Sequence, residues 1–100
     1  MSNKSEAIFS INEAQNQFEL EIGEHTVFLE YYMEGDKMLM THTEAPQELR
    51  GTGAASNLVN QALQYAKNNS LVVVPLCSYV ADYINKHPEW NTILSEGYQM

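Results

Sequence analysis

Basic residues, cysteine and long apolar runs are all scarce in this sequence of 100 residues. Only 5 Lys and Arg stand against 13 Asp and Glu, so the formal net charge is −8. This balance argues against nucleic-acid binding, which needs clustered Lys and Arg to neutralise phosphates. No apolar stretch is long enough to span a membrane, and residues 1–11 lack the basic start and apolar core of a signal peptide. We therefore expect neither a nucleic-acid nor a membrane partner.

The one cysteine that is present, Cys77, cannot form a disulfide within the chain. We therefore expect a reducing, cytoplasmic setting. The three histidines and this cysteine are scattered without the spacing of metal ligands, so no metal site is expected. Ten of the 13 acidic residues lie within residues 1–48. This acidic half could attract a cationic molecule, although solubility explains the charge as well.

The first half of the chain has the pattern of β-hairpins. Its apolar and polar side chains alternate with the period of two that is typical of strands, and turn residues separate the runs. Such close spacing predicts antiparallel pairs. The predicted strands are residues 7–11, 18–22, 25–32 and 37–44.

The last of these runs leads toward the centre of the chain. Met38, Met40 and His42 alternate with their neighbours, so we expect them on one face of the strand. Pro46 cannot donate to a ladder and restricts the residue before it. The strand should therefore end near Glu44 or Ala45.

The second half predicts a strand–helix–strand unit. From Ala54 to Ala66, apolar residues recur at helical spacing, which predicts an amphipathic helix. Residues 71–74 then form a continuous, β-branched run. Such a run is typical of a strand covered on both faces, and we expect it to lie parallel to the strand before the helix. A second, shorter helix is expected over residues 79–86, with Ser78 as its N-cap.

We therefore expect an α/β (α+β) fold with one small core, in a single domain over residues 1–100. Antiparallel hairpins lead into a strand–helix–strand parallel unit, and a second short helix follows. His87-Pro88 should stop that helix. In the tail, Trp90, Ile93 and Leu94 could pack back as one further helical turn.

A glycine-bearing turn, Leu49-Arg-Gly-Thr-Gly-Ala-Ala-Ser56, precedes the amphipathic helix. The first N–H groups of a helix lack intrahelical partners, and the helix dipole is positive there. Gly51 and Gly53 let the backbone approach a bound group closely, and Arg50 is the only arginine in the chain. We therefore expect a phosphate or pyrophosphate to bind here, although a plain turn with an N-cap would leave the same pattern.

Two common phosphate-binding motifs do not fit this turn. The P-loop needs a Gly-Lys pair, and the sequence has none. The dinucleotide fingerprint needs a third glycine where Ser56 stands, and the chain is too short for the doubly wound sheet that carries it.

The spacing Arg50-x-x-Gly53-x-Ala55 resembles the [QR]-x-x-G-x-[GA] signature of the GNAT acetyltransferases, which in that family cradles the pyrophosphate of coenzyme A. The likeness is to a small single-domain branch of the superfamily and extends from about Phe18 to Trp90. It implies a minimal GNAT fold in which two parallel strands splay apart and the pantetheine arm lies in the gap. Four segments carry it: His42-Thr-Glu-Ala-Pro46, Leu49-Arg-Gly-Thr-Gly-Ala-Ala55, Val74-Pro-Leu-Cys-Ser-Tyr-Val80 and His87-Pro-Glu-Trp90.

The resemblance implies acetyl-CoA as a substrate and assigns residues to it. The strand edge at Thr43, Glu44 and Ala45 would pair with the pantetheine amides as if they were another strand. A backbone N–H near that point would face the thioester oxygen, where negative charge develops. The pyrophosphate would bind mostly through backbone N–H groups of the turn. The residues of the turn are Arg50, Gly51, Thr52, Gly53, Ala54 and Ala55.

The implied chemistry is attack of a neutral amine on a thioester, which needs a base for the amine and an acid for the leaving thiolate. Glu44 is the first candidate for the base. His42 is the second, because histidine exchanges protons near neutral pH. The two residues share one strand face, and a surface pair without a catalytic role is equally compatible with their spacing.

Three further residues are candidates near the expected acetyl group. Cys77 could accept that group transiently, or it could be a small buried apolar residue. Tyr79 and Tyr83 lie one helical turn apart, and only one of them could serve as the acid. Either tyrosine could instead belong to the core.

The larger GNAT enzymes carry helices and strands that shape an acceptor pocket, and this chain shows no pattern for them. We therefore expect an open acceptor site and a large amine substrate, such as a protein lysine or N-terminus. A non-catalytic coenzyme-A-binding or acyl-sensing module is the alternative, and a small domain without a ligand is a third. Exposed strand edges and the aromatic residues Phe28, Tyr31 and Tyr32 would permit a weak homodimer, although packing against the helix explains these residues equally well. We expect a monomer or a weak homodimer.

Overall fold

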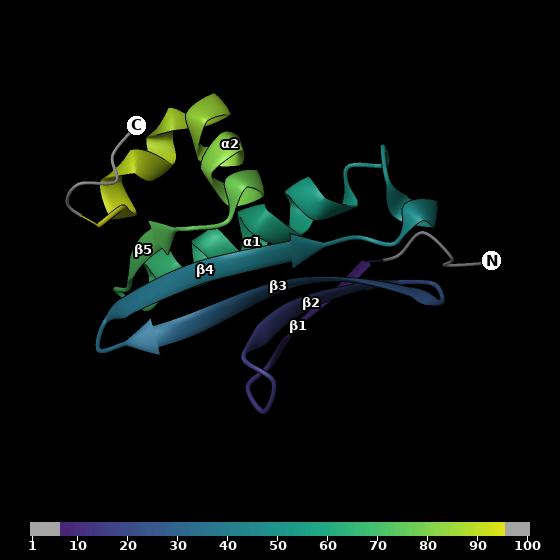
Figure 1. Ribbon diagram of the computed structural model, residues 1–100, viewed down its shortest axis with the longest axis horizontal. Helices are drawn as coiled ribbons and strands as arrows, with labels where there is room; N and C mark the ends of the chain where they lie inside the picture. The colour runs from purple at the N-terminus through teal and green to yellow at the C-terminus, as the bar shows by residue number, and fades with distance from the viewer. Residues whose placement is uncertain (1–6, 96–100) are drawn as a thin grey trace.

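A computed structural model describes residues 7–95 of the chain (Figure 1). Its centre is one sheet whose strands follow the order of the sequence, β1-β2-β3-β4-β5. The first four strands pair antiparallel as consecutive hairpins, and β4 and β5 pair parallel. This mixed architecture confirms the predicted fold class. The strands are β1 (Ala7–Asn12), β2 (Gln17–Ile22), β3 (His25–Glu34), β4 (Lys37–Glu44) and β5 (Val72–Pro75).

The helices α1 (Ala54–Asn68), α2 (Ser78–Lys86) and η2 (Pro88–Ile93) lie on one side of the sheet (Figure 1). Between β4 and α1 the chain forms the short helix η1 (Gln47–Leu49). The apolar stripe of α1 packs on the side chains that point up from β2, β3 and β4, which is the burial that stabilises a short amphipathic helix. The fully buried side chains of this core include Phe18, Leu20, Val27, Leu29, Met40, Leu58, Val59 and Leu63.

The C-terminal end of α1 is closed by a Schellman motif. The Leu71 N–H donates to the Ala66 carbonyl at 2.9 Å, and the Ser70 N–H donates to the Lys67 carbonyl at 3.2 Å. These are the two bonds that define the motif, and they require a left-handed residue between them. Ser70 fills that place with a φ of 57°, which is strained for a residue that has a Cβ.

We expect Ser70→Gly to stabilise the protein. Glycine adopts this conformation without a Cβ clash, so the free energy of unfolding should rise by about 0.5–1 kcal/mol. Urea denaturation followed by circular dichroism measures the change. Ser78→Gly is the matched control, because the same substitution at the first residue of α2 offers no relief of strain. A gain in Ser78→Gly equal to that in Ser70→Gly would contradict this explanation.

A bulge in β4 overturns one prediction made from the alternation. Tyr31 pairs with Met40 and Glu30 pairs with His42, so Thr41 has no partner in the register. Because one residue is inserted, all side chains beyond it change face. Met38 and Met40 therefore point toward the helices, whereas His42 lies on the opposite face of the sheet. The prediction that these three residues share a face was wrong, since apolar–polar alternation does not mark an inserted polar residue.

The other predicted boundaries agree closely with the structure. β4 ends at Glu44, and β5 is parallel to it. The N-cap of α2 is Cys77 rather than the predicted Ser78, which is already the first helical residue. Trp90 and Leu94 pack back against the core at 9% and 5% exposure, as predicted for the tail. Residues 96–100 of that tail lie outside the described part of the chain.

Candidate functional site

The turn between η1 and α1 presents backbone donors at the start of the longest helix. Gly51 and Gly53 have φ angles of 80° and 86°, a left-handed conformation that favours glycine. The Asn57 N–H makes the first bond of the helix, to the Gly53 carbonyl. Within residues 7–95, the N–H groups of Gly53, Ala55 and Ser56 therefore have no hydrogen-bond partner. Such a group of unpaired donors, at the positive end of a helix dipole, is suited to an anion.

Thr52 holds this turn in shape. Its hydroxyl donates to the Leu49 carbonyl and accepts from the Ala54 N–H at 3.3 Å. The Thr52 N–H also donates to the Leu49 carbonyl, at 3.2 Å. The Thr52 side chain therefore fixes the backbone of the turn through these bonds.

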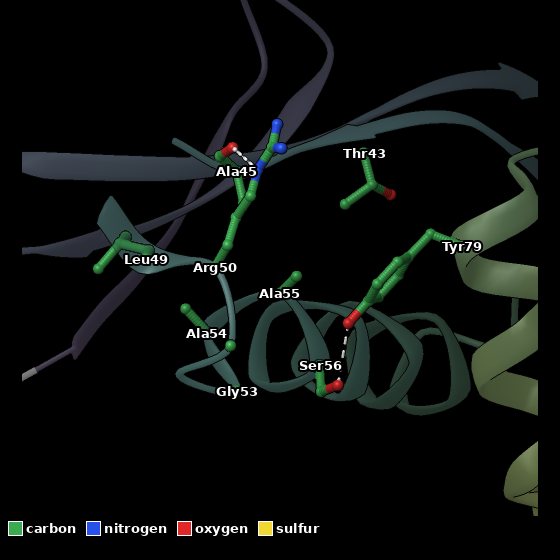
Figure 2. Close-up of a pocket in the computed structure, with 10 residues that line it drawn as sticks. Thr43, Ala45, Leu49, Arg50, Gly53, Ala54, Ala55, Ser56 and Tyr79 are labelled. Carbon is green, nitrogen blue, oxygen red and sulfur yellow. Dashed lines mark hydrogen bonds between the residues drawn. The ribbon is translucent and has the colours of Figure 1, made fainter. Parts of the chain in front are cut away.

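A pocket of about 470 Å³ opens above the turn, and Figure 2 shows its lining. It extends from the turn to the end of β4 on one side and to α2 on the other. Arg50 is its only charged lining residue, and its Nε donates to the Ala45 carbonyl at 3.4 Å. A cation beside free N–H groups makes this pocket chemically suited to an anion, although the protein has a net charge of −8. The lining residues are Thr43, Ala45, Leu49, Arg50, Gly51, Gly53, Ala54, Ala55, Ser56 and Tyr79.

A second pocket, of about 430 Å³, lies on the other side of the same turn. It shares Leu49, Gly53 and Ala54 with the first pocket and reaches to β1 and β2 through Ala7 and Ile22. The two pockets therefore meet at the turn, and a long ligand held there by a phosphate group would have room in both directions.

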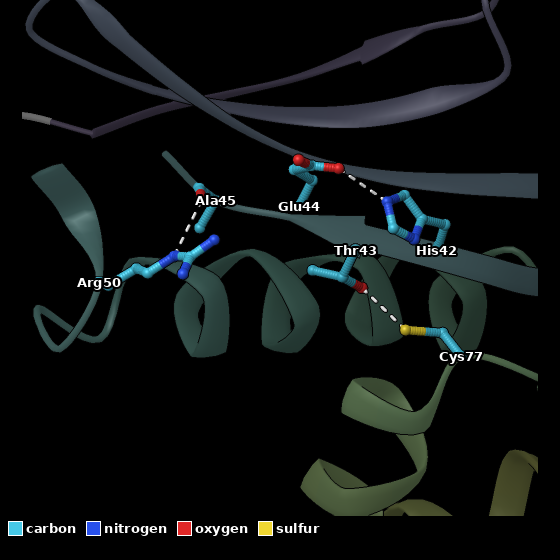
Figure 3. A network of polar contacts seen from close by, with 6 residues as sticks. All are labelled: His42, Thr43, Glu44, Ala45, Arg50 and Cys77. Atoms are coloured by element: carbon cyan, nitrogen blue, oxygen red, sulfur yellow. Dashed lines mark hydrogen bonds and ion pairs between the residues drawn. The ribbon is translucent and has the colours of Figure 1, made fainter. Parts of the chain in front are cut away.

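Beyond the turn, the first pocket borders the place where β4 and β5 diverge. Their pairing ends at Met40 and Pro75, after which β4 continues alone on that side while the chain turns into α2. The Cys77 N–H donates to the Met40 carbonyl at 2.8 Å and closes the end of this ladder. Figure 3 shows the Thr43 hydroxyl directed at the Cys77 sulfur, 3.3 Å away. Cys77 is buried and does not line the pocket, whereas its partner Thr43 does.

His42 and Glu44 lie on the other face of β4 (Figure 3). The Nε2 of His42 and the Oε1 of Glu44 are 2.8 Å apart, and both side chains are more than half exposed. The Phe28 ring lies beside His42, with ring centroids 6.2 Å apart. The pair is therefore formed as predicted from its spacing, but it does not line the pocket, because alternate residues of a strand point to opposite faces.

The two tyrosines of α2 are placed differently. Tyr79 lines the pocket, and its hydroxyl is 3.0 Å from the Ser56 hydroxyl across the space between α2 and α1. Tyr83 does not line the pocket and stacks on His87, with ring centroids 4.1 Å apart. Burial, and then the charge of Glu89, raise the pKa of Tyr83. Of the two candidates for the acid, only Tyr79 lines the pocket at the turn.

A comparison with protein-family models gives a match over residues 17–93, to a family described as GCN5-related N-acetyltransferase. The chain belongs to this family. The match covers β2 to β5, the glycine-bearing turn, both α-helices and η2, and it begins after β1. It confirms the GNAT resemblance and supports acetyltransferase activity in general. Members of the family generally use acetyl-CoA, and the pocket at the turn has the donors and the cation that the pyrophosphate of such a ligand requires.

Several features of the candidate site were not predicted from the sequence. The bulge at Thr41 aligns Thr43 with the pocket, but a polar insertion within a polar stretch leaves no signal. The contact between Thr43 and Cys77 joins residues 34 positions apart and could not be read from spacing. Ser56 was recognised as part of the turn but not as the partner of Tyr79. No local pattern marks this contact, because Ser56 and Tyr79 lie 23 positions apart.

Two further features were searched for among the described residues: a cluster of metal ligands and a membrane-spanning helix. Among residues 7–95, no three His, Cys, Asp or Glu side chains come together in an arrangement that could hold a metal ion. Within the same part of the chain, no helix combines the length and apolarity needed to cross a membrane.

Proposed function

We propose that this GNAT domain is an acetyl-CoA-dependent N-acetyltransferase that acts on an amine. One observation carries the proposal: the turn with unpaired N–H groups and Arg50 opens into a pocket that runs to the end of β4. The pyrophosphate would accept hydrogen bonds from the turn, and the pantetheine arm would follow the free edge of β4 at Thr43, Glu44 and Ala45. The second pocket offers room for the nucleotide end.

Acetyl-CoA supplies an acetyl group activated as a thioester. In direct transfer, the amine nitrogen bonds to the carbonyl carbon, the carbon–sulfur bond breaks, the amine loses a proton and the thiolate gains one. A backbone N–H of the β4 edge would stabilise the negative charge on the carbonyl oxygen. The His42–Glu44 pair lies on the far face of β4. It would take the amine proton around the free part of that strand, beyond the end of the β4–β5 ladder. Tyr79 is the candidate for the acid that protonates the thiolate.

Cys77 offers a second route, in which its sulfur accepts the acetyl group before the amine does. The Cys77 sulfur would bond to the carbonyl carbon, and the proton of its thiol would pass to the departing thiolate. Thr43 is positioned to orient this thiol, because its hydroxyl lies 3.3 Å from the sulfur. The burial of Cys77 is also compatible with a simple packing role.

A non-catalytic coenzyme-A-binding module is the second candidate function. The orientation of His42 and Glu44 favours it, since both side chains point away from the pocket. Both candidates share the pyrophosphate turn, so binding alone does not distinguish them.

Calorimetric titration with acetyl-CoA, followed by an assay of transfer to small amines and peptides, tests the proposal. We expect binding at one site and acetylation of at least one class of amine. Intact-mass measurement after incubation with acetyl-CoA would detect one acetyl group on the wild type and none on Cys77→Ala if the cysteine route operates. Binding without transfer to any amine would favour the non-catalytic module. A folded protein that binds neither acetyl-CoA nor free coenzyme A would overturn both functions.

A further inference from the structure

All described helices that cover the sheet pack on one face of it, and the opposite face is bare (Figure 1). The register assigns alternate residues of each strand to this open face. Tyr32 and Ile8, at 64% and 56% exposure, are on it, as is the partly buried Phe28. Phe28 and Tyr32 therefore do not pack against the helix. The register separates Ile8 from Tyr32 along the sheet, so the face carries no continuous apolar patch, and its charges decide which partner it suits.

The charges of this face are almost all of one sign. Five glutamates project from three neighbouring strands, while Lys37 and His42 are the only basic residues there in the described part of the chain. Lys37 is directly opposite Glu34 in the register, and the His42 ring lies 2.8 Å from the Glu44 carboxylate, so each basic residue stands beside a glutamate. The glutamates are Glu19, Glu21, Glu30, Glu34 and Glu44.

Carboxylates and an aromatic ring meet at the centre of this face. Glu19 of β2 is directly opposite Phe28 of β3, and Phe28 is directly opposite Glu44 of β4. The Glu19 carboxylate is held by the side-chain amides of Asn12 and Gln17, at 3.0 and 2.7 Å. An aromatic surface between carboxylates suits Lys and Arg side chains, whose aliphatic stems pack on the ring while their charged ends reach the carboxylates.

We propose that the open face docks a Lys- or Arg-rich segment of polypeptide, the acceptor of the acetyl group. The proposal rests on the proposed function for the reaction and adds the class of substrate. Charge complementarity selects this occupant: nucleic acid is repelled, and a second copy would bring the same glutamates face to face. The width of the open face also favours a polypeptide, because its four strands span about 15 Å, far more than a small amine would fill.

The docked segment would reach the proposed base without a further rearrangement. His42 and Glu44 form the β4 margin of the open face, whereas their neighbour Thr43 lines the pocket on the other side. A lysine at the end of the docked segment would therefore meet the base on one face of β4 and the acetyl group at its edge. β4 would therefore lie between the cationic peptide on the open face and the anionic acetyl-CoA in the pocket.

Binding of a fluorescein-labelled lysine-rich peptide, measured by anisotropy, tests this docking. Glu19→Lys/Glu21→Lys reverses two charges of the open face on β2, two strands away from His42 and Glu44. We expect peptide affinity to fall about tenfold or more, and about threefold for the neutral Glu19→Gln/Glu21→Gln. Binding to the wild type should weaken steeply as salt is raised. Acetyl-CoA affinity and transfer to a small amine should stay unchanged.

Asp82→Lys/Glu89→Lys is the matched control, since it makes the same change in net charge on α2 and η2. Its peptide affinity should stay within about twofold of the wild type, because exposed charges beyond a Debye length are screened. Equal losses in the two lysine variants, or no peptide binding by the wild type, would overturn the proposal. The proposal would also be overturned if the wild type sedimented as a dimer and Glu19→Gln/Glu21→Gln as a monomer, because a second copy would then occupy this face. Peptide binding without any acetyl transfer would support the docking and overturn the proposed function alone.

Discussion

Gly53→Trp should abolish acetyl-CoA binding while leaving a folded protein. Gly53 forms the N-cap of α1 with a φ of 86°, and its N–H is one of the unpaired donors of the turn. An indole at this position fills the pocket above the turn and disfavours the left-handed conformation that aims those donors outward. The loss of two or more hydrogen bonds to a charged group corresponds to a fall in affinity of about 100-fold or more. Isothermal titration calorimetry with acetyl-CoA measures it.

Gly35→Trp is the control that distinguishes the effect of blocking the pocket from the effect of straining the backbone. Gly35 lies in the turn between β3 and β4, has a φ of 62°, and like Gly53 has no atom within 4 Å of an added Cβ. Both substitutions should lower the free energy of unfolding by about 1–2 kcal/mol, which urea denaturation would show. Gly35→Trp should nevertheless bind acetyl-CoA as the wild type does, because Gly35 lines neither of the two pockets at the turn. Wild-type affinity in Gly53→Trp would show that the pyrophosphate binds elsewhere.

The parts of the fold that were predicted are those with a local signal. Period-two alternation gave the hairpins, and helical spacing from Ala54 to Ala66 gave α1. The Schellman motif was not foreseen, because a left-handed Ser70 is set by the backbone and not by its side chain. The N-cap of α2 was missed by one residue, since a serine follows Cys77 and serine is the better N-cap.

The same distinction between local and long-range features applies to the candidate site. The glycine-bearing turn before α1 was predictable because it is contiguous in sequence, and its unpaired N–H groups follow from the backbone at the start of a helix. Residues that join across the fold were not, as the contact between Thr43 and Cys77 and that between Ser56 and Tyr79 illustrate. The bulge at Thr41 had the largest consequence. It assigns His42 and Glu44 to the open face of the sheet and leaves Thr43 on the pocket side.

Glu44→Gln should lower the rate of acetyl transfer to a small amine by about 100-fold or more, the usual contribution of a general base. Glutamine keeps the shape of the side chain and can still bond to His42, but it cannot hold a proton taken from the amine. Acetyl-CoA affinity should be unchanged, because the Glu44 side chain does not line the pocket. The loss should therefore appear in kcat. Stability should change by less than about 1 kcal/mol, since the pair is exposed.

Two comparisons decide whether the pair acts as a base. Glu21→Gln removes a carboxylate from the same face but two strands away, and it should leave transfer to a small amine unchanged. His42→Asn and the double variant form a cycle with Glu44→Gln. If the two residues relay one proton across their 2.8 Å contact, the double variant should be no slower than the worse single variant. Multiplying losses would indicate independent roles. Undiminished transfer in the double variant would exclude the pair from the chemistry and leave Cys77 as the residue to test next.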